Sequence, residues 1–255
     1  MIGDYYEKGQ GEVDMYITHL IHSTFLIETK KAFILFDYYG KGQLPEHFDK
    51  DIYIFSSHSH EDHFDMKVLE LFADNPRAFF IMAYDIRRNF GDRIKSEYPN
   101  VQDRIIYLMP NRETDIGDVH IETLASTDAG VAYIVTHNHK VFFHAGDLHL
   151  WIWKEESDRY NERMSNAYYK RIAELKNRVI DYAFYPVDLR QEEHYDKGLK
   201  YFLDNTKTVK VFPMHYFENY STTDKIFRNK SLSDHYEKIV RVEHVNQVFH
   251  FEEES

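Results

Sequence analysis

Short apolar or alternating runs recur along the chain, and charged or polar residues separate them. Runs of about four to eight such residues are typical of buried or half-buried strands. Residues 15–29 and 31–37, which meet at a pair of lysines, predict a hairpin. Further strands are predicted at 51–57, 77–83, 118–126, 131–137, 140–147, 181–188 and 209–215, with a last edge strand within 244–255.

Other segments have apolar residues at helical spacing, three or four positions apart. The longest, 155–180, is highly charged and contains neither proline nor glycine, which favours a helix. Helices are predicted at 65–74, 84–98, 155–180 and 197–205. This order of strands and helices is compatible with an α/β fold but does not choose among α/β architectures.

Five of the predicted strands end on an aspartate or a histidine. These residues are Asp37, His58, Asp147, Asp188 and His215. Polar residues commonly follow strands, and this explains any one of the five. It explains less well why nearly all are of types that bind metals. Because sheet-based sites gather side chains from several strand ends at one edge, the five residues predict a shared site.

The segment "SSHSHEDHFD" follows the strand at 51–57 and is rich in imidazole and carboxylate groups. Residues two apart in an extended segment point to the same side, so His58 and His60 suit one metal ion. Asp62 and His63 begin the next helix and suit a second ion nearby. Imidazole and carboxylate together fit zinc, with iron or manganese as alternatives. The other interpretation is a solvated loop in which Asp62 or Asp65 caps the helix.

The pattern H-x-H-x-D-H after a hydrophobic strand resembles the signature of the metallo-β-lactamase fold superfamily, and further motifs follow in that family's order. Asp37 in "FILFDYYG" resembles the buried aspartate that braces the metal loop. Asp147 in "FFHAGD" resembles the aspartate that bridges two metals, and His215 in "FPMHY" resembles the last histidine ligand. Residues 22–29, "HSTFLIET", are similar to the N-terminal strand of the branch that includes the sugar-lactone lactonases. The resemblance covers about residues 17–216.

This resemblance implies an αββα four-layer sandwich, in which helices cover both sides of two mixed sheets. It implies one or two zinc ions, with manganese or iron as alternatives. The implied metal ligands are His58, His60, Asp62, His63, Asp147 and His215. It also implies hydrolysis by a metal-activated water, because two divalent metals lower the pKa of water toward neutrality. Asp62 is the implied catalytic residue that orients this water.

One motif of the family is missing from the sequence. The family usually supplies a third histidine for the first metal, where this chain has Ser126, Thr127 and Asp128. By the family pattern the second site is therefore complete. The first site has His58 and His60, with Asp147 and Asp128 as candidate additions. Asp128 is either an oxygen ligand or a residue that caps the turn before a glycine.

Several residues near these motifs are candidates for binding a metal or a substrate. A guanidinium matches carboxylate or phosphate, so Arg190 beside Asp188 suits an anionic group, although a surface ion pair explains the two equally well. His22 lies where the related branch also has a histidine and either supports the metal ligands or belongs to the core. Trp151 and Trp153 follow the bridging aspartate and are candidates for a pocket wall, with core packing as the alternative.

Composition narrows the classes of function. We expect a single domain over residues 1–255, because no repeat, low-complexity tract or flexible linker divides the chain. A net charge of −12 disfavours nucleic acid and anionic membranes as partners, and the absence of cysteine excludes a thiolate site. Residues 1–15 lack an apolar signal-peptide core, and no run of about 18 apolar residues occurs. We therefore expect a cytoplasmic protein with a small-molecule substrate and no membrane partner.

Three interpretations of the function stay open. The first is a metal-dependent hydrolase of an ester, lactone, phosphodiester or amide. The second is a di-iron oxidoreductase on the same fold. Iron branches often have glutamate at the third position of the signature, where this chain has His60, and we expect no appended flavin-binding domain here. The third is a metal-binding protein without catalysis. Because this fold hosts many substrates, the resemblance does not name one.

Overall fold

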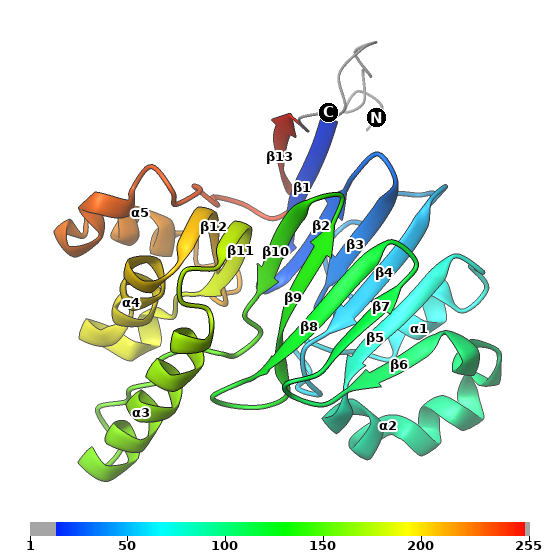
Figure 1. Cartoon of the computed structure of the whole chain (residues 1–255), viewed down its shortest axis with the longest axis horizontal. Coiled ribbons are helices and arrows are strands. Elements are labelled where there is room, and N and C mark those ends of the chain that lie inside the picture. Colours follow the sequence, from blue (N-terminus) through cyan, green and yellow to red (C-terminus); the bar gives the residue numbers. More distant parts are fainter. Residues whose placement is uncertain (1–13, 253–255) are drawn as a thin grey trace.

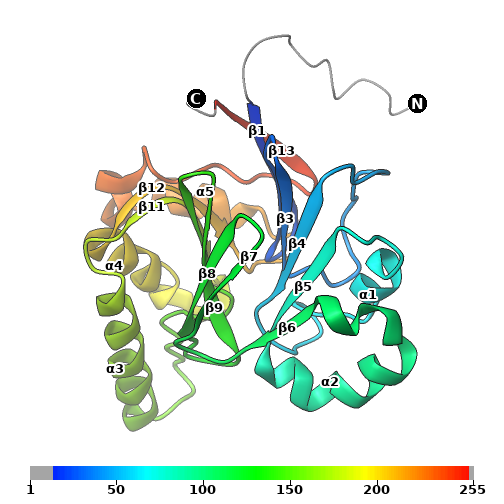
Figure 2. The same ribbon diagram turned by 45° about the vertical axis from the view of Figure 1, so that its right-hand side comes forward.

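The computed structural model describes residues 14–252 and places two β-sheets face to face, with helices on both outer sides (Figure 1). Helices α1 (Lys67–Phe72) and α2 (Tyr84–Glu97) cover the outer face of one sheet. Helices α3 (Asp158–Glu174) and α4 (Lys197–Asn205) cover the outer face of the other (Figure 2). The predicted αββα sandwich is therefore confirmed.

One sheet has seven strands in the described part of the chain. They are β1 (Asp14–Ile21), β2 (Thr24–Glu28), β3 (Ala32–Phe36), β4 (Asp51–Ser56), β5 (Ala78–Ala83), β6 (Ile105–Leu108) and β13 (Gln247–Glu252). Their spatial order is β13-β1-β2-β3-β4-β5-β6. Strands β3 to β6 run parallel, whereas β13, β1, β2 and β3 pair antiparallel. The sheet is thus mixed, and β13 is the edge strand that the sequence predicts.

The other sheet has six strands, and it is also mixed. They are β7 (Glu113–Ile116), β8 (Val119–Ala125), β9 (Val131–His137), β10 (Lys140–His144), β11 (Val179–Pro186) and β12 (Lys207–Met214). Their order is β12-β11-β10-β9-β8-β7. Because β10, β11 and β12 run parallel, their carboxyl ends lie at one edge of the sheet. Residues that follow these three strands can therefore meet.

Some elements were not predicted from the apolar pattern. They are β6, β7, helix α5 (Ser221–Arg228) and the 3-10 helices η1 (Pro99–Arg104), η2 (Leu189–His194) and η3 (Lys230–His235). Each is eight residues long or shorter, so few apolar positions mark it. Strand β7, for example, buries only its last residue. Neighbouring elements, rather than local pattern, hold such segments in place.

The apolar core divides into two clusters. One cluster joins the inner faces of the two sheets, where the ring of Phe184 lies 4.4 Å from that of Phe25 and 5.7 Å from that of Phe36. The other cluster packs α1 and α2 against the seven-stranded sheet. The buried Tyr133 hydroxyl donates to the carbonyl of Ser56 at 3.0 Å, which ties β9 to the end of β4 in the facing sheet. This contact lies just before the histidine-rich segment.

Two predicted elements have different boundaries in the structure. The stretch 15–29 is not one strand, because His22 adopts a left-handed conformation (φ 54°) and turns the chain between β1 and β2. The helix predicted at 155–180 ends at Glu174, since the chain continues into β11 at Val179. Strand pairing with the parallel neighbours outweighs the local helical preference there.

The predictions for the two chain ends fall partly outside the described residues. The expected lack of a signal-peptide core concerns residues 1–15, of which 1–13 are not described, and the last three residues of the predicted edge strand are not described either. Within residues 14–252, no helix is both long enough and apolar enough to cross a membrane.

Candidate metal centre

The histidine-rich segment lies between β4 and α1 and folds as a tight loop, which we call the metal loop (residues 57–65). Its turn is closed by the amides of His63 and Phe64, which both donate to the carbonyl of His60, at 3.0 and 2.9 Å. The side chains of His58 and His63 are buried, whereas that of His60 is 52% exposed. The loop therefore presents two buried imidazoles and one at the surface.

Asp37 follows β3 and lies completely buried beneath the metal loop. Its carboxylate accepts hydrogen bonds from the amide of Ser57 at 2.7 Å, the hydroxyl of Ser57 at 2.6 Å and Nδ1 of His63 at 2.7 Å. Because Nδ1 of His63 carries the proton, its Nε2 keeps the lone pair that a metal ligand needs. Asp37 thus contacts both the backbone and an imidazole of the metal loop.

The same carboxylate also sets the tautomer of His58, through Ser57. The hydroxyl of Ser57 donates to Asp37, so it can accept from Nδ1 of His58 at 3.0 Å. Nε2 of His58 is then free of its proton and lies 3.4 Å from an Oδ of Asp147. One buried carboxylate thus fixes the tautomers of two imidazoles and leaves on each the lone pair that a metal would need. Sequence analysis did not single out Ser57, whose only signal is its place between strand and motif.

Asp147 lies after β10, and its two carboxylate oxygens face three ring nitrogens. One oxygen, Oδ1, lies 3.3 Å from Nε2 of His63 and 3.4 Å from Nε2 of His215. The other, Oδ2, faces His58. Oδ1 and Nε2 of His63 are buried and have no hydrogen-bond partner within residues 14–252. Two buried acceptors that face each other without a shared proton are unfavourable unless a cation lies between them.

The spacing of these acceptors also fits a metal ion. Zinc binds nitrogen and oxygen ligands at about 2.0–2.2 Å in tetrahedral geometry, which separates two of its ligands by about 3.3–3.6 Å. The distances from Oδ1 of Asp147 to His63 and His215, 3.3 and 3.4 Å, fall within this range. The donor set present in the fold therefore fits a divalent metal.

His22 supports Asp62 rather than offering a lone pair. Its Nδ1 accepts from the amide of Phe217 at 3.1 Å, so the proton is on Nε2, which donates to Oδ2 of Asp62 at 3.2 Å. The ring of Phe217 stacks on that of His22 at 3.9 Å and keeps it in this orientation. His22 therefore holds one oxygen of Asp62 in place.

Taken by ligand-atom distance, the candidate ligands form two groups. One group holds His22, Asp62, His63 and His215, and the other holds His58, His60 and Asp147, with the ligand atoms of each group within 4.8 Å of one another. The family resemblance gave Asp147 as an aspartate that bridges two metals. Because its two oxygens face members of both groups, the structure places Asp147 between them.

The loop that lacks the third histidine lies directly against the metal loop. Gly130 permits this approach: its φ is +65°, and a Cβ there would fall 1.9 Å from the carbonyl oxygen of Ser57. The hydroxyl of Thr127 is committed to the backbone of His149, and that of Ser126 accepts from the amide of Asp128 at 3.1 Å. Both hydroxyls are therefore already engaged in hydrogen bonds to the backbone.

Asp128 is near the group of His58, His60 and Asp147 without belonging to it. One carboxylate oxygen lies 3.9 Å from Nδ1 of His60, and the side chain is 52% exposed. Nδ1 of His60 instead contacts Nε2 of His58 at 3.0 Å. The group around His60 is thus more open to solvent and has fewer donors than the buried group around His63.

Burial shapes the ionisation of the centre. It lowers the pKa of both His58 and His63 well below the usual value, which favours the neutral imidazole that binds metals. Burial raises the pKa of Asp147 to about 7. For His215 burial opposes the charge, but the carboxylates of Asp147 and Asp188 outweigh it and raise its pKa. The centre therefore gathers groups whose charges are costly to bury unless a cation balances them.

Asp188 and Arg190 form an ion pair beside the metal centre. Nε of Arg190 donates to both carboxylate oxygens of Asp188, at 2.9 and 3.0 Å, and one of these oxygens lies 3.4 Å from Nδ1 of His215. Asp188 is buried, whereas the Arg190 side chain is 64% exposed. The structure thus places Asp188 behind a candidate ligand and Arg190 at the surface of the site.

A further contact to the metal loop, from α2, was missed by sequence reasoning. Oδ2 of Asp85 accepts from the amide of Ser59 at 2.8 Å, and Nδ2 of Asn89 donates to the hydroxyl of Ser59 at 2.7 Å. An aspartate in the first turn of a helix is common, so nothing in the local pattern marked Asp85. His144, by contrast, is buried and donates to the carbonyl of Ser23 at 2.9 Å, as a structural histidine would.

An αββα sandwich whose strand ends carry facing imidazoles and carboxylates is a metallo-β-lactamase fold. The chain matches the family model described as the beta-lactamase superfamily domain over residues 16–162, more than half of its length, and it belongs to this family. A search of curated proteins finds no match.

Solved structures share the fold. Igni18, described as a metallo hydrolase from Ignicoccus hospitalis, is 17% identical with a TM-score of 0.63, over 94% of this chain and 100% of that one. A Parabacteroides distasonis protein, provisionally assigned as a metal-dependent hydrolase, is 17% identical with a TM-score of 0.64, over 96% and 99%. CmlA, a diiron β-hydroxylase from Streptomyces venezuelae, is 11% identical with a TM-score of 0.59, over 96% of this chain but 55% of its own. At these identities the likeness shows the fold alone.

Proposed function

We propose that this protein is a metal-dependent hydrolase that cleaves an ester, lactone, phosphodiester or amide bond in a small molecule. The observation that carries the proposal is the pair of buried acceptors, Nε2 of His63 and Oδ1 of Asp147, which face each other at 3.3 Å without a hydrogen-bond partner in the described part of the chain. Kinship with the sugar-lactone lactonase branch, suggested by residues 22–29, is part of the proposal. The single domain and the cytoplasmic location stay predictions from the sequence.

The proposed ligands of the buried site are Asp62, His63, Asp147 and His215, and those of the open site are His58, His60 and Asp147. Zinc is the metal that we propose, because imidazole and carboxylate are its common ligands in chains without thiolates. When bound, a divalent metal would lower the pKa of a coordinated water to about 7 and would stabilise negative charge on a carbonyl or phosphoryl oxygen.

The residues around the ligands would then position the reactants. Asp62 has one oxygen held by His22 and 28% of its side chain exposed, so its other oxygen can accept a proton from water and orient it. Asp37 keeps His63 in the tautomer that leaves Nε2 free, and Asp188 lies beside the far nitrogen of His215. These contacts hold the imidazoles in one orientation before a substrate arrives.

The alternatives are a di-iron oxidoreductase and a metal-binding protein without catalysis. The likeness to CmlA fits the first only weakly, since this chain spans 55% of that protein. His60 at the third position of the signature also favours a hydrolase over the iron branches. The open site around His60 is the feature that suits the non-catalytic alternative.

The test combines elemental analysis with a substrate panel. We expect at least one zinc per chain after reconstitution, and turnover of at least one of four probes: an aryl ester, a lactone, a phosphodiester and an anilide. Asp62→Asn should lower kcat by about 100-fold or more, because it removes a positioned proton acceptor. Asp65→Asn, in the same loop, should change kcat by less than about twofold. Less than about 0.2 metal per chain in both purified and zinc-reconstituted protein would contradict the proposal.

A further inference from the structure

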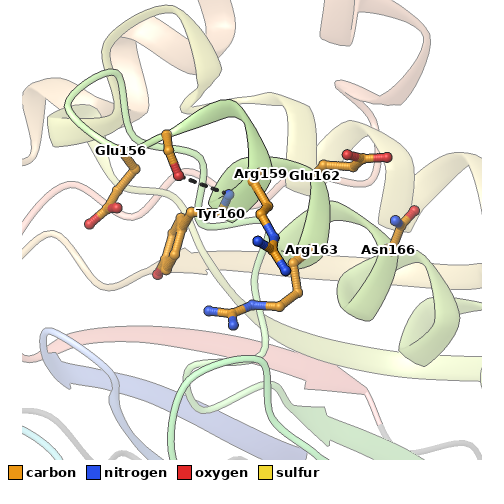
Figure 3. A pocket seen from close by; sticks show the side chains of 7 residues that line it. Glu156, Arg159, Tyr160, Glu162, Arg163 and Asn166 are labelled. Atoms are coloured by element: carbon orange, nitrogen blue, oxygen red, sulfur yellow. Dashed lines mark hydrogen bonds between the residues drawn. The ribbon is translucent and has the colours of Figure 1, made fainter.

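Two cavities lie near α3, and only the smaller one opens onto the metal centre. The larger, about 580 Å³, is formed around the first turns of α3, where Arg159 and Arg163 project beside Tyr160 (Figure 3). None of the candidate metal ligands lines it. The smaller cavity, about 160 Å³, is lined by Asp147 and His215. A molecule bound in the smaller cavity would therefore contact the centre directly.

One wall of the smaller cavity is aromatic and apolar. It consists of Trp151, Trp153, Tyr160 and Met164. Nε1 of Trp151 donates to the carbonyl of Asp147 at 2.9 Å, so this indole is fixed to the backbone of a candidate ligand. The ring of Trp153 stacks on that of Trp151, with 5.9 Å between centroids and an interplanar angle of 6°. The two parallel indoles form a preformed aromatic wall.

Helix α3 fixes this wall through Asn161. Its Oδ1 accepts from the amide of Trp153 at 3.1 Å, and its Nδ2 donates to the carbonyl of Trp153 at 2.8 Å. The same helix contributes Tyr160 and Met164 to the wall. Because the backbone of Trp153 is held on both its polar groups, the surface does not need to be ordered when a ligand binds, which favours affinity.

The charged groups that line the cavity are unevenly distributed. Arg190 is the only arginine or lysine among the described residues that line it. One edge of its guanidinium is held by Asp188, and its largely exposed remainder is available for an anion. Asp128 lies in the same lining and faces His60, so an anionic group would be favoured on the Arg190 side only.

We propose that this cavity is the substrate pocket and that it selects a small molecule with a flat apolar group and an anionic group. The flat group would stack on Trp153, and the anion would pair with Arg190. The inference rests on the proposed function for the position of the scissile bond. A volume of about 160 Å³ is below the ~300 Å³ at which drug-sized ligand pockets begin, which limits the bound part of the substrate to a single ring with its substituents.

The chain provides its own probe for this proposal, because it contains two tryptophans and both line the cavity. We would titrate zinc-loaded full-length protein with benzenesulfonate and follow tryptophan emission. Methyl phenyl sulfone keeps the ring and the tetrahedral sulfur but is neutral, and methanesulfonate keeps the anion but lacks the ring. We expect a saturable change with benzenesulfonate, and dissociation constants at least about tenfold higher for the other two.

Variants test the contact with the anionic group and the contact with the aromatic ring separately. Arg190→Gln should raise the dissociation constant of benzenesulfonate by about tenfold and leave that of methyl phenyl sulfone within about twofold. Arg159→Gln, an exposed arginine that lines only the larger cavity, is the matched control and should change neither. Met164→Ala should weaken the binding of both aromatic probes, and it keeps both tryptophans as reporters. Circular dichroism confirms that each variant is folded.

The outcomes separate this inference from the proposed function. If no probe changes the emission saturably, or if Arg159→Gln weakens benzenesulfonate as much as Arg190→Gln does, the pocket assignment is wrong. If the probes bind as expected but no compound of the substrate panel is turned over, the pocket stands and the hydrolase proposal fails. If substrates with and without an anionic aryl group are hydrolysed at the same rate, the hydrolase proposal stands and the proposed selectivity of the pocket is wrong.

Discussion

At the scale of single residues, the candidate metal centre depends on how protons are distributed among its histidines. Asp37 accepts directly from His63 and, through the hydroxyl of Ser57, fixes His58 as well. His22 is held in the opposite sense, because its Nδ1 accepts an amide proton. Residues of one type therefore take different roles according to what their second nitrogen contacts.

The missing histidine leads to a prediction at this scale. The open site offers His58, His60 and Asp147, while Asp128 stays 3.9 Å from His60. We expect calorimetric zinc titration of the metal-free protein to show one tight site and a second at least about tenfold weaker, because one nitrogen donor is absent. Ser126→His should restore that donor and bring the stoichiometry toward two.

Two control variants accompany this titration. Ser126→Ala removes the hydroxyl that accepts from the amide of Asp128 and should leave the stoichiometry unchanged, so any gain in Ser126→His belongs to the imidazole. Asp128→Ala should weaken only the second site, because the carboxylate 3.9 Å from His60 adds negative charge beside that site without being a ligand. Two equally tight sites in the wild type that are indifferent to Asp128→Ala would mean that the third ligand lies elsewhere.

At the scale of elements, α2 positions the metal loop. Asp85 and Asn89, one turn apart, hold the backbone and side chain of Ser59, which lies between two candidate ligands. The other oxygen of Asp85 is buried and has no hydrogen-bond partner among the described residues, so the side chain of Asp85 is bound to the metal loop through Ser59. Helix α2 thus acts on the centre from outside the set of ligands.

Asp85→Ala should therefore weaken metal binding without removing a ligand. Loss of a hydrogen bond to a charged group costs about 1.5–3 kcal/mol, and if the cost falls on the bound state the dissociation constant of the open site rises about tenfold or more. Calorimetry measures this. Asp85→Asn keeps an acceptor and should recover most of the affinity, whereas Asp92→Ala, exposed on the same helix, should have no effect. Equal weakening in Asp92→Ala would indicate a general effect on the helix.

At the scale of the whole molecule, the candidate ligands come from both sheets. His58, His60, Asp62 and His63 follow β4 of the seven-stranded sheet, whereas Asp147 and His215 follow β10 and β12 of the six-stranded sheet. A metal held by both sets would join the two sheets at one edge of the sandwich. Without a cation, the same edge brings together unpaired acceptors in a buried place.

Metal removal should therefore lower the stability of the entire fold. A ligand at about 1,000 times its dissociation constant adds about 4 kcal/mol, and in a chain of this size each kcal/mol shifts Tm by about 2–4 °C. We expect zinc to raise Tm by about 8–16 °C over chelator-treated protein in a calorimetric scan. Asp147→Ala should lose most of this shift, while Asp92→Ala should keep it. A wild-type Tm indifferent to chelator would contradict a metal that joins the sheets.

Much of this architecture was predictable from local signals. The apolar runs marked most of the strands, and the spacing of the motif from His58 to His63 identified the candidate ligands, because residue type and spacing suffice for both. The contacts that organise the ligands were not predictable in this way. Asp37 and His63 are 26 positions apart, and His22 and Phe217 are 195 apart. No local periodicity carries information across such separations.

The sequence by itself determined which chemical groups are available and that they follow the ends of strands. Only the tertiary structure decided which groups face each other: Asp147 between the two ligand groups, His22 as a support for Asp62, Asp128 outside the open site, and the tryptophan wall beside Arg190. The physical reason is that these two kinds of interaction act over different separations along the chain. Strand and turn preferences act over a few residues, whereas the position of one sheet relative to the other is set by the packing of the whole core between them.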